Sequence, residues 1–276
     1  MADQPTITLN SGTAMPQLGF GVFKVPDDET AAAVSAAFEA GYRAIDTAAM
    51  YRNEGGVGKA IADSGIARDE LFITTKLNND GHGTDAALRA FEVSRTRLGL
   101  DYVDLYLIHW PLPAQDRYVQ TWQAFEKLKR DGLARAIGVS NFKPAHLQRL
   151  FDKTDVVPAL NQVELHPYLT QDVLRAFDAQ HGIATEAWSP IARGGDLLSD
   201  PAITALAEKY SKTPAQIVIR WHLQLGNVVI PKSVTPSRIA ENFDVFDFEL
   251  AEDDVTSISA LNRDERTGPD PDTVNP

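Results

Sequence analysis

The chain contains no cysteine among its 276 residues. Disulfide bonds, thiolate nucleophiles and cysteine-ligated metal sites are therefore all excluded, as suits a protein of the reducing cytoplasm. Long apolar runs are also absent, since none approaches the roughly 20 residues that a membrane-spanning helix needs. Residues 1–5 lack the basic and then apolar pattern of a signal peptide. We therefore expect a cytoplasmic protein that does not enter a membrane.

Positive charge is scarce as well. Lysine and arginine total 26 against 38 acidic residues, which gives a formal net charge of −12. Such a balance argues against a general nucleic-acid surface, and an anionic ligand would require cations gathered at one place. The six histidines show no close metal-ligand spacing, so we expect no metal site.

Short apolar runs alternate with amphipathic stretches of about ten to fifteen residues, a rhythm that predicts repeated βα units around a parallel sheet. Eight strands are expected, at residues 17–19, 42–46, 71–76, 103–109, 134–139, 159–163, 183–188 and 228–230. A (β/α)8 TIM barrel typically needs about 250 residues. The length therefore predicts one such barrel, as a single domain over residues 1–276.

Helical patterns fill the intervals between the strands. Helices are expected at residues 28–40, 84–98, 118–130, 143–151, 171–180, 200–210, 214–225 and 236–243. Two features lie outside this rhythm. Residues 7–9 and 14–16 flank Asn10-Ser11-Gly12 and predict an N-terminal β-hairpin. Residues 252–261 predict an extra C-terminal helix, followed by a loop or tail to residue 276.

An open, doubly wound sheet would show the same alternation. A dinucleotide-binding sheet of that kind has a glycine-rich turn between its first strand and helix. The nearest candidate, Gly55-Gly56-Val57-Gly58, follows no predicted strand and lacks the required spacing. The pattern therefore favours the closed barrel.

Polar or aromatic residues stand at the ends of seven successive apolar runs. In a (β/α)8 barrel the carboxyl ends of all strands meet at one rim, where the active site lies. Any one of these residues has a structural explanation, but together they indicate a shared site. They are Asp46, Lys76, His109, Ser140 with Asn141, Gln162, Trp188 and Lys232.

Four residues of this rim suit the reduction of a carbonyl group, which needs a proton at oxygen as hydride reaches carbon. Tyr51 lies five residues after Asp46 and is near enough to reach back over the rim. A free phenol has a pKa of about 10, and an adjacent Lys76 cation makes it a better acid. Asp46 would hold Lys76 charged and in place. His109 can donate a hydrogen bond that polarises the carbonyl.

The segments that carry these residues resemble the aldo-keto reductase family. The matching stretches are residues 41–48 (GYRAIDTA) with Tyr51, residues 98–111 (LGLDYVDLYLIHWP), residues 230–233 (IPKS) and residues 238–242 (RIAEN). The resemblance runs in order from residue 9 to about residue 261. Residues 20–25 (FGVFKV) and 186–190 (EAWSP) are similar to the bacterial 2,5-diketo-D-gluconate reductase group.

The resemblance implies a catalytic tetrad of Asp46, Tyr51, Lys76 and His109, with Tyr51 as the general acid. It also implies NADPH as the cofactor. Ser140, Asn141 and Gln162 would hold the nicotinamide carboxamide, and Trp188 would stack on the ring, where many members have tyrosine. The other residues that the resemblance assigns to the cofactor are Ser189, Ile191, Glu241 and Asn242.

Lys232, Ser233 and Arg238 supply two cations and a hydroxyl close to the start of one predicted helix, which suits a terminal phosphate. They form the local positive cluster that an acidic protein would need. The cluster favours NADPH over NADH, whose ribose lacks the extra phosphate. The alternative is a helix start with ordinary surface charges.

The expected walls of the substrate pocket are Phe23, Met50, Asn78 and Trp110, with the tail near residues 269–276. Many relatives carry a bulky aromatic residue at the position of Asn78, so we expect a wider or more polar pocket here. For Phe23 and Met50, ordinary core packing is an equal alternative. Dicarbonyls, keto-sugars and aromatic aldehydes all remain open as substrates.

The predicted function is the NADPH-dependent reduction of aldehydes or ketones to alcohols, by a chain that the family resemblance suggests is monomeric. One alternative is an aldolase that uses Lys76 as a Schiff-base nucleophile. An aldolase, however, has no need of the cationic cluster or of Trp188. The other alternative is a cofactor-sensing binding module on the same barrel, against which the complete tetrad argues.

Overall fold

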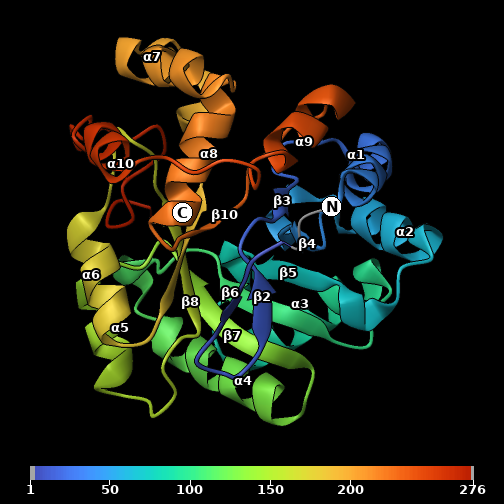
Figure 1. The fold of residues 1–276 in the computed structure, drawn as a ribbon. Coiled ribbons are helices and arrows are strands. Elements are labelled where there is room, and N and C mark those ends of the chain that lie inside the picture. The colour runs from blue at the N-terminus through green and yellow to red at the C-terminus, as the bar shows by residue number, and fades with distance from the viewer. Residues whose placement is uncertain (1–3, 275–276) are drawn as a thin grey trace.

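The structure, a computed structural model, describes residues 4–274, and in it eight parallel strands form a barrel (Figure 1). Each strand from β3 to β10 is hydrogen-bonded to the next one along the chain. The strands are β3 (Phe20–Gly21), β4 (Ala44–Asp46), β5 (Phe72–Leu77), β6 (Val103–Ile108), β7 (Ala134–Ser140), β8 (Leu160–Glu164), β9 (Ala184–Trp188) and β10 (Val228–Val229).

The barrel closes through the segment just before β3. The Gly19 N–H donates to the Val229 carbonyl at 2.9 Å, and the Val229 N–H donates to the Gln17 carbonyl at 2.9 Å. Residues 17–19, predicted as the first strand, therefore pair with β10, whereas β3 itself pairs with β4. The predicted (β/α)8 barrel is confirmed.

Helices surround the barrel, and eight of them match the predicted positions closely. They are α1 (Asp27–Ala40), α3 (Thr84–Leu98), α4 (Tyr118–Arg130), α5 (Pro144–Phe151), α6 (Asp172–Gln180), α7 (Pro201–Tyr210), α8 (Pro214–Gln224) and α9 (Pro236–Phe243). The helix α2 (Glu54–Ser64) was not predicted, because its three glycines have low helix propensity. Two of these glycines serve packing, and all three lie within the helix and not in a dinucleotide turn. A Cβ on Gly56 would lie 2.6 Å from the Asp27 carbonyl oxygen, and one on Gly58 would lie 2.5 Å from that of Leu98.

The predicted hairpin and C-terminal helix are both present. Strands β1 (Thr6–Thr8) and β2 (Ala14–Pro16) pair antiparallel. Leu9 and Met15 pack against apolar side chains of the barrel interior, so the hairpin plugs one end of the barrel. Helix α10 (Glu252–Ser259) ends two residues before the predicted limit, and a tail follows it.

Alternation along the strands decides which side chains enter the barrel. On β5, Phe72 packs in the interior cluster, whereas Ile73 and Leu77 pack between the sheet and the helices. The period of two residues therefore places Lys76 inside the barrel, near the carboxyl end of its strand. The same rule explains why polar residues at several strand ends meet in one place.

Within residues 4–274, no helix is both long and apolar enough to cross a bilayer. In the same range, no group of three or more histidine or acidic side chains is placed to hold a metal ion. The predictions for residues 1–3 and for residues 275–276 of the tail concern positions outside the described residues.

Candidate active site

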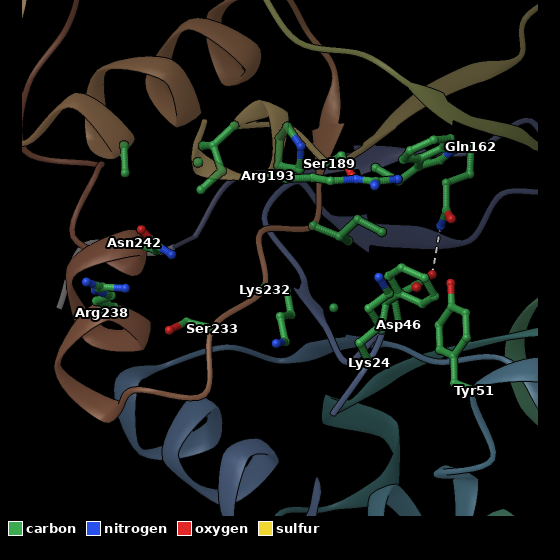
Figure 2. A pocket seen from close by; sticks show the side chains of 18 of the residues that line it. Lys24, Asp46, Tyr51, Gln162, Ser189, Arg193, Lys232, Ser233, Arg238 and Asn242 are labelled. Carbon is green, nitrogen blue, oxygen red and sulfur yellow. Dashed lines mark hydrogen bonds between the residues drawn. The ribbon is translucent and has the colours of Figure 1, made fainter. Parts of the chain in front are cut away.

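A cavity of about 900 Å³ lies at the carboxyl ends of the strands. Figure 2 shows Asp46, Tyr51 and Gln162 at one end of it and Ser233 and Arg238 at the other. All eleven residues predicted to bind the cofactor line this cavity, namely Ser140, Asn141, Gln162, Trp188, Ser189, Ile191, Lys232, Ser233, Arg238, Glu241 and Asn242. The cavity is thus elongated, with the predicted catalytic residues far from Ser233 and Arg238 and with Lys232 between the two ends (Figure 2).

The four predicted catalytic residues come together at one end. Asp46, Tyr51 and His109 line the cavity, and Lys76 is wholly buried beside them. The Lys76 Nζ donates to Asp46 Oδ1 at 2.5 Å, to the Thr47 carbonyl at 2.9 Å and to Tyr51 Oη at 3.4 Å. The rings of Tyr51 and His109 meet edge to face, with centroids 5.6 Å apart.

The position of Tyr51 depends on a short turn that follows β4. Residues Ala49–Tyr51 form a 3₁₀ turn, which ends at Arg52 in the left-handed region (φ 58°). The buried Asn53 fixes this turn, because its Oδ1 accepts from Thr47 Oγ1 at 2.8 Å and its Nδ2 donates to the Val22 carbonyl at 2.9 Å. Asn53 is an organising residue that sequence reasoning did not single out.

Burial decides the protonation of Tyr51. Burial raises the pKa of Tyr51 above its ordinary value of 10, and the charge of Lys76, which lowers this pKa, does not outweigh burial. The sequence predicted that Lys76 makes the phenol more acidic, and Lys76 does lower the pKa of Tyr51, but burial raises this pKa by more. At neutral pH the Tyr51 phenol keeps its proton and remains available as a donor.

Lys76 and His109 have opposite charge states. Burial would lower the pKa of Lys76, but Asp46 and Tyr51 outweigh burial and raise this pKa, so the lysine is charged. Burial and the Lys76 charge lower the pKa of His109 well below 6.5, so its ring is neutral at pH 7. The His109 Nδ1 is buried without a hydrogen-bond partner among residues 4–274. A neutral imidazole still has one N–H to donate to a ligand.

The residues predicted for the nicotinamide carboxamide form a network of their own. The Ser140 Oγ donates to the Gln162 carbonyl at 2.8 Å, and the Asn141 Nδ2 donates to the His109 carbonyl at 2.9 Å. The Trp188 Nε1 donates to Asn141 Oδ1 at 2.8 Å, which fixes the plane of the indole ring. The site therefore holds its amides and its large aromatic ring in set orientations.

The cationic cluster lies at the beginning of α9. Lys232 and Arg238 are exposed, and neither forms an ion pair with another residue in the described part of the chain. In a protein of net charge −12, two such cations on the wall of one cavity call for a physical explanation. A bound phosphate at the α9 N-terminus supplies one, so these residues fit the NADPH phosphate.

Comparisons with known proteins point to one family. The aldo/keto reductase family matches residues 11–263. An aldo-keto reductase of Mycolicibacterium smegmatis is 58% identical over 98% of both chains. The methylglyoxal reductase DkgA of Escherichia coli K12 is 55% identical over 99% of this chain and 98% of its own. The crystal structure of a Gox0644 mutant in complex with NADPH is 52% identical over 99% of each chain, with a TM-score of 0.95.

The chain belongs to the aldo-keto reductase family. This aldo-keto reductase is accordingly an oxidoreductase, and its cofactor is NADPH. The sequence resemblance to the family and to the diketogluconate-reductase group is confirmed by these matches.

Three of the four residues predicted for the substrate pocket of the reductase line the cavity, together with Pro269 of the tail. Phe23 and Met50 are 46% and 37% exposed, so they are not core residues. Asn78 is placed elsewhere, in an adjoining hollow of about 460 Å³ that shares Met50 with the cavity. Trp110 is the third residue of the main cavity, and the role of Asn78 stays a prediction.

Sequence reasoning missed three charged residues of this site. Lys24 and Arg193 line the cavity, and Glu186 lies buried next to Gln162. A signal existed for Glu186, because a charged residue inside an otherwise apolar strand is rare unless it has a partner. No comparable signal marked Arg193, whose loop after β9 has an irregular backbone.

Proposed function

We propose that this aldo-keto reductase reduces small aldehydes or ketones to alcohols with Tyr51 as the proton donor. The observation that carries the proposal is the hydrogen-bonded group of Asp46, Lys76 and Tyr51 beside a neutral His109 on the wall of one cavity. When bound, NADPH supplies the hydride that reaches the carbonyl carbon. The side chains of this chain perform the remaining tasks.

Each member of the tetrad has one task. His109 donates a hydrogen bond to the carbonyl oxygen and polarises it. Tyr51 Oη gives its proton to that oxygen, and the Lys76 charge stabilises the phenolate that remains. Asp46 accepts from Lys76 and keeps it charged and oriented. A Schiff-base aldolase is disfavoured, because that chemistry needs a lysine of lowered pKa, whereas the pKa of Lys76 is raised.

The rest of the cavity binds and orients. Lys232, Ser233 and Arg238 hold the terminal phosphate of NADPH, and Ser140, Asn141 and Gln162 hold its carboxamide. Trp188 packs on the nicotinamide ring. The other predicted cofactor residues also line the cavity, namely Ser189, Ile191, Glu241 and Asn242.

The cavity walls and the names of the relatives support a choice of substrate class. Phe23, Met50 and Trp110 form an apolar mouth that accepts a small carbonyl compound. Because several relatives are named methylglyoxal reductases, we place small dicarbonyls first, ahead of keto-sugars and aromatic aldehydes. Asn78 extends the mouth on its polar side.

The test is the oxidation of NADPH, followed by absorbance, with a panel of dicarbonyls, keto-sugars and aromatic aldehydes. NADH serves as the control cofactor. Turnover that depends on the carbonyl and is faster with NADPH than with NADH supports the proposal. Tight NADPH binding without turnover of any carbonyl would instead favour the cofactor-sensing module.

We also propose that the chain acts as a single-domain monomer in the cytoplasm. Light scattering during size-exclusion chromatography is then expected to give the mass of one chain at all concentrations tested. Unfolding in denaturant is expected to follow one cooperative transition. A mass of two or more chains would rule out the monomer, and two separate transitions would rule out the single domain.

A further inference from the structure

One buried carboxyl next to the tetrad takes no part in the reaction described above. Glu186, in the middle of β9, has no exposed surface. Its Oε2 accepts a hydrogen bond from Gln162 Nε2 at 2.7 Å, whereas its Oε1 has no partner among the described residues. A buried carboxylate with one oxygen unpaired is costly, so this group needs an explanation.

The Gln162 amide joins Glu186 to the tetrad. Its Nε2 also donates to Asp46 Oδ2 at 2.7 Å, the bond drawn as a dashed line in Figure 2. The other oxygen of Asp46 accepts from Lys76, and Lys76 donates to Tyr51. Glu186 and Gln162 are register partners on neighbouring strands, so the backbone fixes their spacing. A continuous line of hydrogen bonds therefore leads from Glu186 to the Tyr51 phenol.

The charges around Glu186 are unbalanced when it is ionised. Two carboxyls, Asp46 and Glu186, then face a single cation, Lys76, from different strands of the barrel interior. Gln162 faces Glu186 from β8, and on the other side its register partner in β10 is the apolar Val228. Only a protonated Glu186 leaves the group neutral.

The ionisation of Glu186 lies within an accessible pH range. Burial and then the negative charge of Asp46 raise the pKa of Glu186 to about 8, although Gln162 and Lys76 act in the opposite direction. Below this value the carboxyl is protonated. Above it, the new negative charge raises the pKa of Tyr51.

We propose that Glu186 is a positioning residue whose protonation sets the charge of the tetrad and so controls how readily Tyr51 releases its proton. Protonated Glu186 permits reduction, and ionised Glu186 slows it. The proton of Glu186 exchanges with solvent and does not go to the substrate. This inference rests on the proposed function of Tyr51 as the donor.

The test is the pH dependence of kcat for carbonyl reduction in the wild-type protein and in Glu186→Gln. One pH unit above a pKa of about 8, only about a tenth of the carboxyl remains protonated. We therefore expect the wild-type kcat to fall by up to about tenfold between about pH 7 and about pH 9. Glu186→Gln should keep its kcat over this range, with the KM for NADPH unchanged at pH 7.

Asp178→Asn is the matched control. Asp178 is also a buried carboxyl of raised pKa, at about 7, but it accepts from Thr185 and Asn161 and has no bond to the tetrad. This variant should therefore retain the wild-type decline. The inference is overturned if Glu186→Gln declines like the wild type, or if Asp178→Asn loses the decline as well. If the wild type reduces no carbonyl compound at all, the proposed function itself is wrong.

A second measurement needs no variant at position 186. Wild-type protein labelled with ¹³C-glutamate should show the infrared C=O band of a buried protonated glutamate at about pH 7, and this band should vanish with a midpoint near 8. The label keeps the aspartates, Asp178 included, out of this band. The absence of this band from the labelled protein at pH 7 would show that Glu186 is ionised there, which would contradict the proposal.

Discussion

At Tyr51 two opposite influences act on one proton. The Lys76 charge favours its release, and burial opposes it more strongly, so the phenol is protonated at neutral pH. The sequence predicted the lysine, because Lys76 ends an apolar run as Asp46 does. It could not predict the burial of the phenol, which depends on the turn that Asn53 ties to the Val22 carbonyl.

Arg238 provides the residue-scale prediction for cofactor choice. If Arg238 binds the terminal phosphate as proposed, Arg238→Ala removes a charge-assisted contact, and the Kd for NADPH is expected to rise about tenfold or more. The Kd for NADH should stay the same, because NADH lacks this phosphate. Fluorescence titration measures both constants, and Arg130→Ala, an exposed arginine of α4, is the control. Equal weakening of NADPH and NADH would show that Arg238 does not select the phosphate.

Several site residues lay beyond sequence reasoning at this scale. Glu186 was seen only as part of a matching segment, because its significance depends on Gln162 and Asp46 from other strands. Asn78 was expected beside the substrate; it lines the adjoining hollow, which shares Met50 with the main cavity, and its role stays a prediction. Contacts that join distant parts of the chain need the fold before they can be recognised.

Among the elements, helix α2 departs most from the sequence prediction. Glycine is a poor helix former, so the pattern of residues 54–64 did not indicate a helix. Neighbouring helices require two of the glycines, since a Cβ on Gly56 would lie 2.6 Å from the Asp27 carbonyl oxygen and one on Gly58 would lie 2.5 Å from that of Leu98. Tertiary packing has here overridden local propensity.

Two alanine substitutions in α2 are expected to act in opposite directions. Gly58→Ala should lower the free energy of unfolding by about 1–3 kcal/mol, because the added methyl meets the α3 backbone. Gly55→Ala places its Cβ no closer than 3.6 Å to Asp27, so better helix propensity should raise stability by about 0.5–1 kcal/mol. Urea unfolding measures both. If Gly58→Ala were as stable as Gly55→Ala, the close α2–α3 contact would be wrong.

The C-terminal tail is held to the barrel by Glu164, at the end of β8. Glu164 Oε1 accepts from the Thr267 N–H at 2.5 Å and from Thr267 Oγ1 at 2.6 Å. The next residue, Gly268, packs so closely on Trp188 that a Cβ would lie 2.4 Å from the indole ring. The anchor therefore places Pro269 on the cavity wall.

The anchor predicts a loosening of the tail in acid. Burial would raise the pKa of Glu164, but hydrogen bonds from His166 and Thr267 outweigh burial and hold this pKa below 4.5. A lowered folded-state pKa gives stability above the unfolded value, and that stability is lost as pH falls through the folded value. The protection factors of the amides in residues 263–270, which correct for the intrinsic exchange rate, should therefore fall as the pH drops through the lowered pKa of Glu164. Glu164→Gln should show the faster exchange at neutral pH, whereas exchange unaltered by this change would exclude the anchor.

For the whole molecule, the repeated pattern made the barrel predictable. Each βα unit shows the same alternation, and a strand end that is polar in one unit is polar in the next, as with Lys76 and His109. The closure of the barrel was less visible, because β10 has only two residues, Val228 and Val229, and pairs with the segment before β3. Because the net charge of the protein is negative, the cations that line the cavity stand out, and they indicate an anionic ligand.

Under the proposed function, the barrel rim carries out carbonyl reduction through the proton of Tyr51. The most direct measurement compares the wild type with Tyr51→Phe, for kcat of carbonyl reduction and for the Kd of NADPH. We expect kcat to fall by about 10²–10⁴-fold, the usual range for a general acid, with the Kd almost unchanged. A Tyr51→Phe protein that reduces carbonyls at the wild-type rate, or that loses NADPH binding together with turnover, would contradict the proposed function.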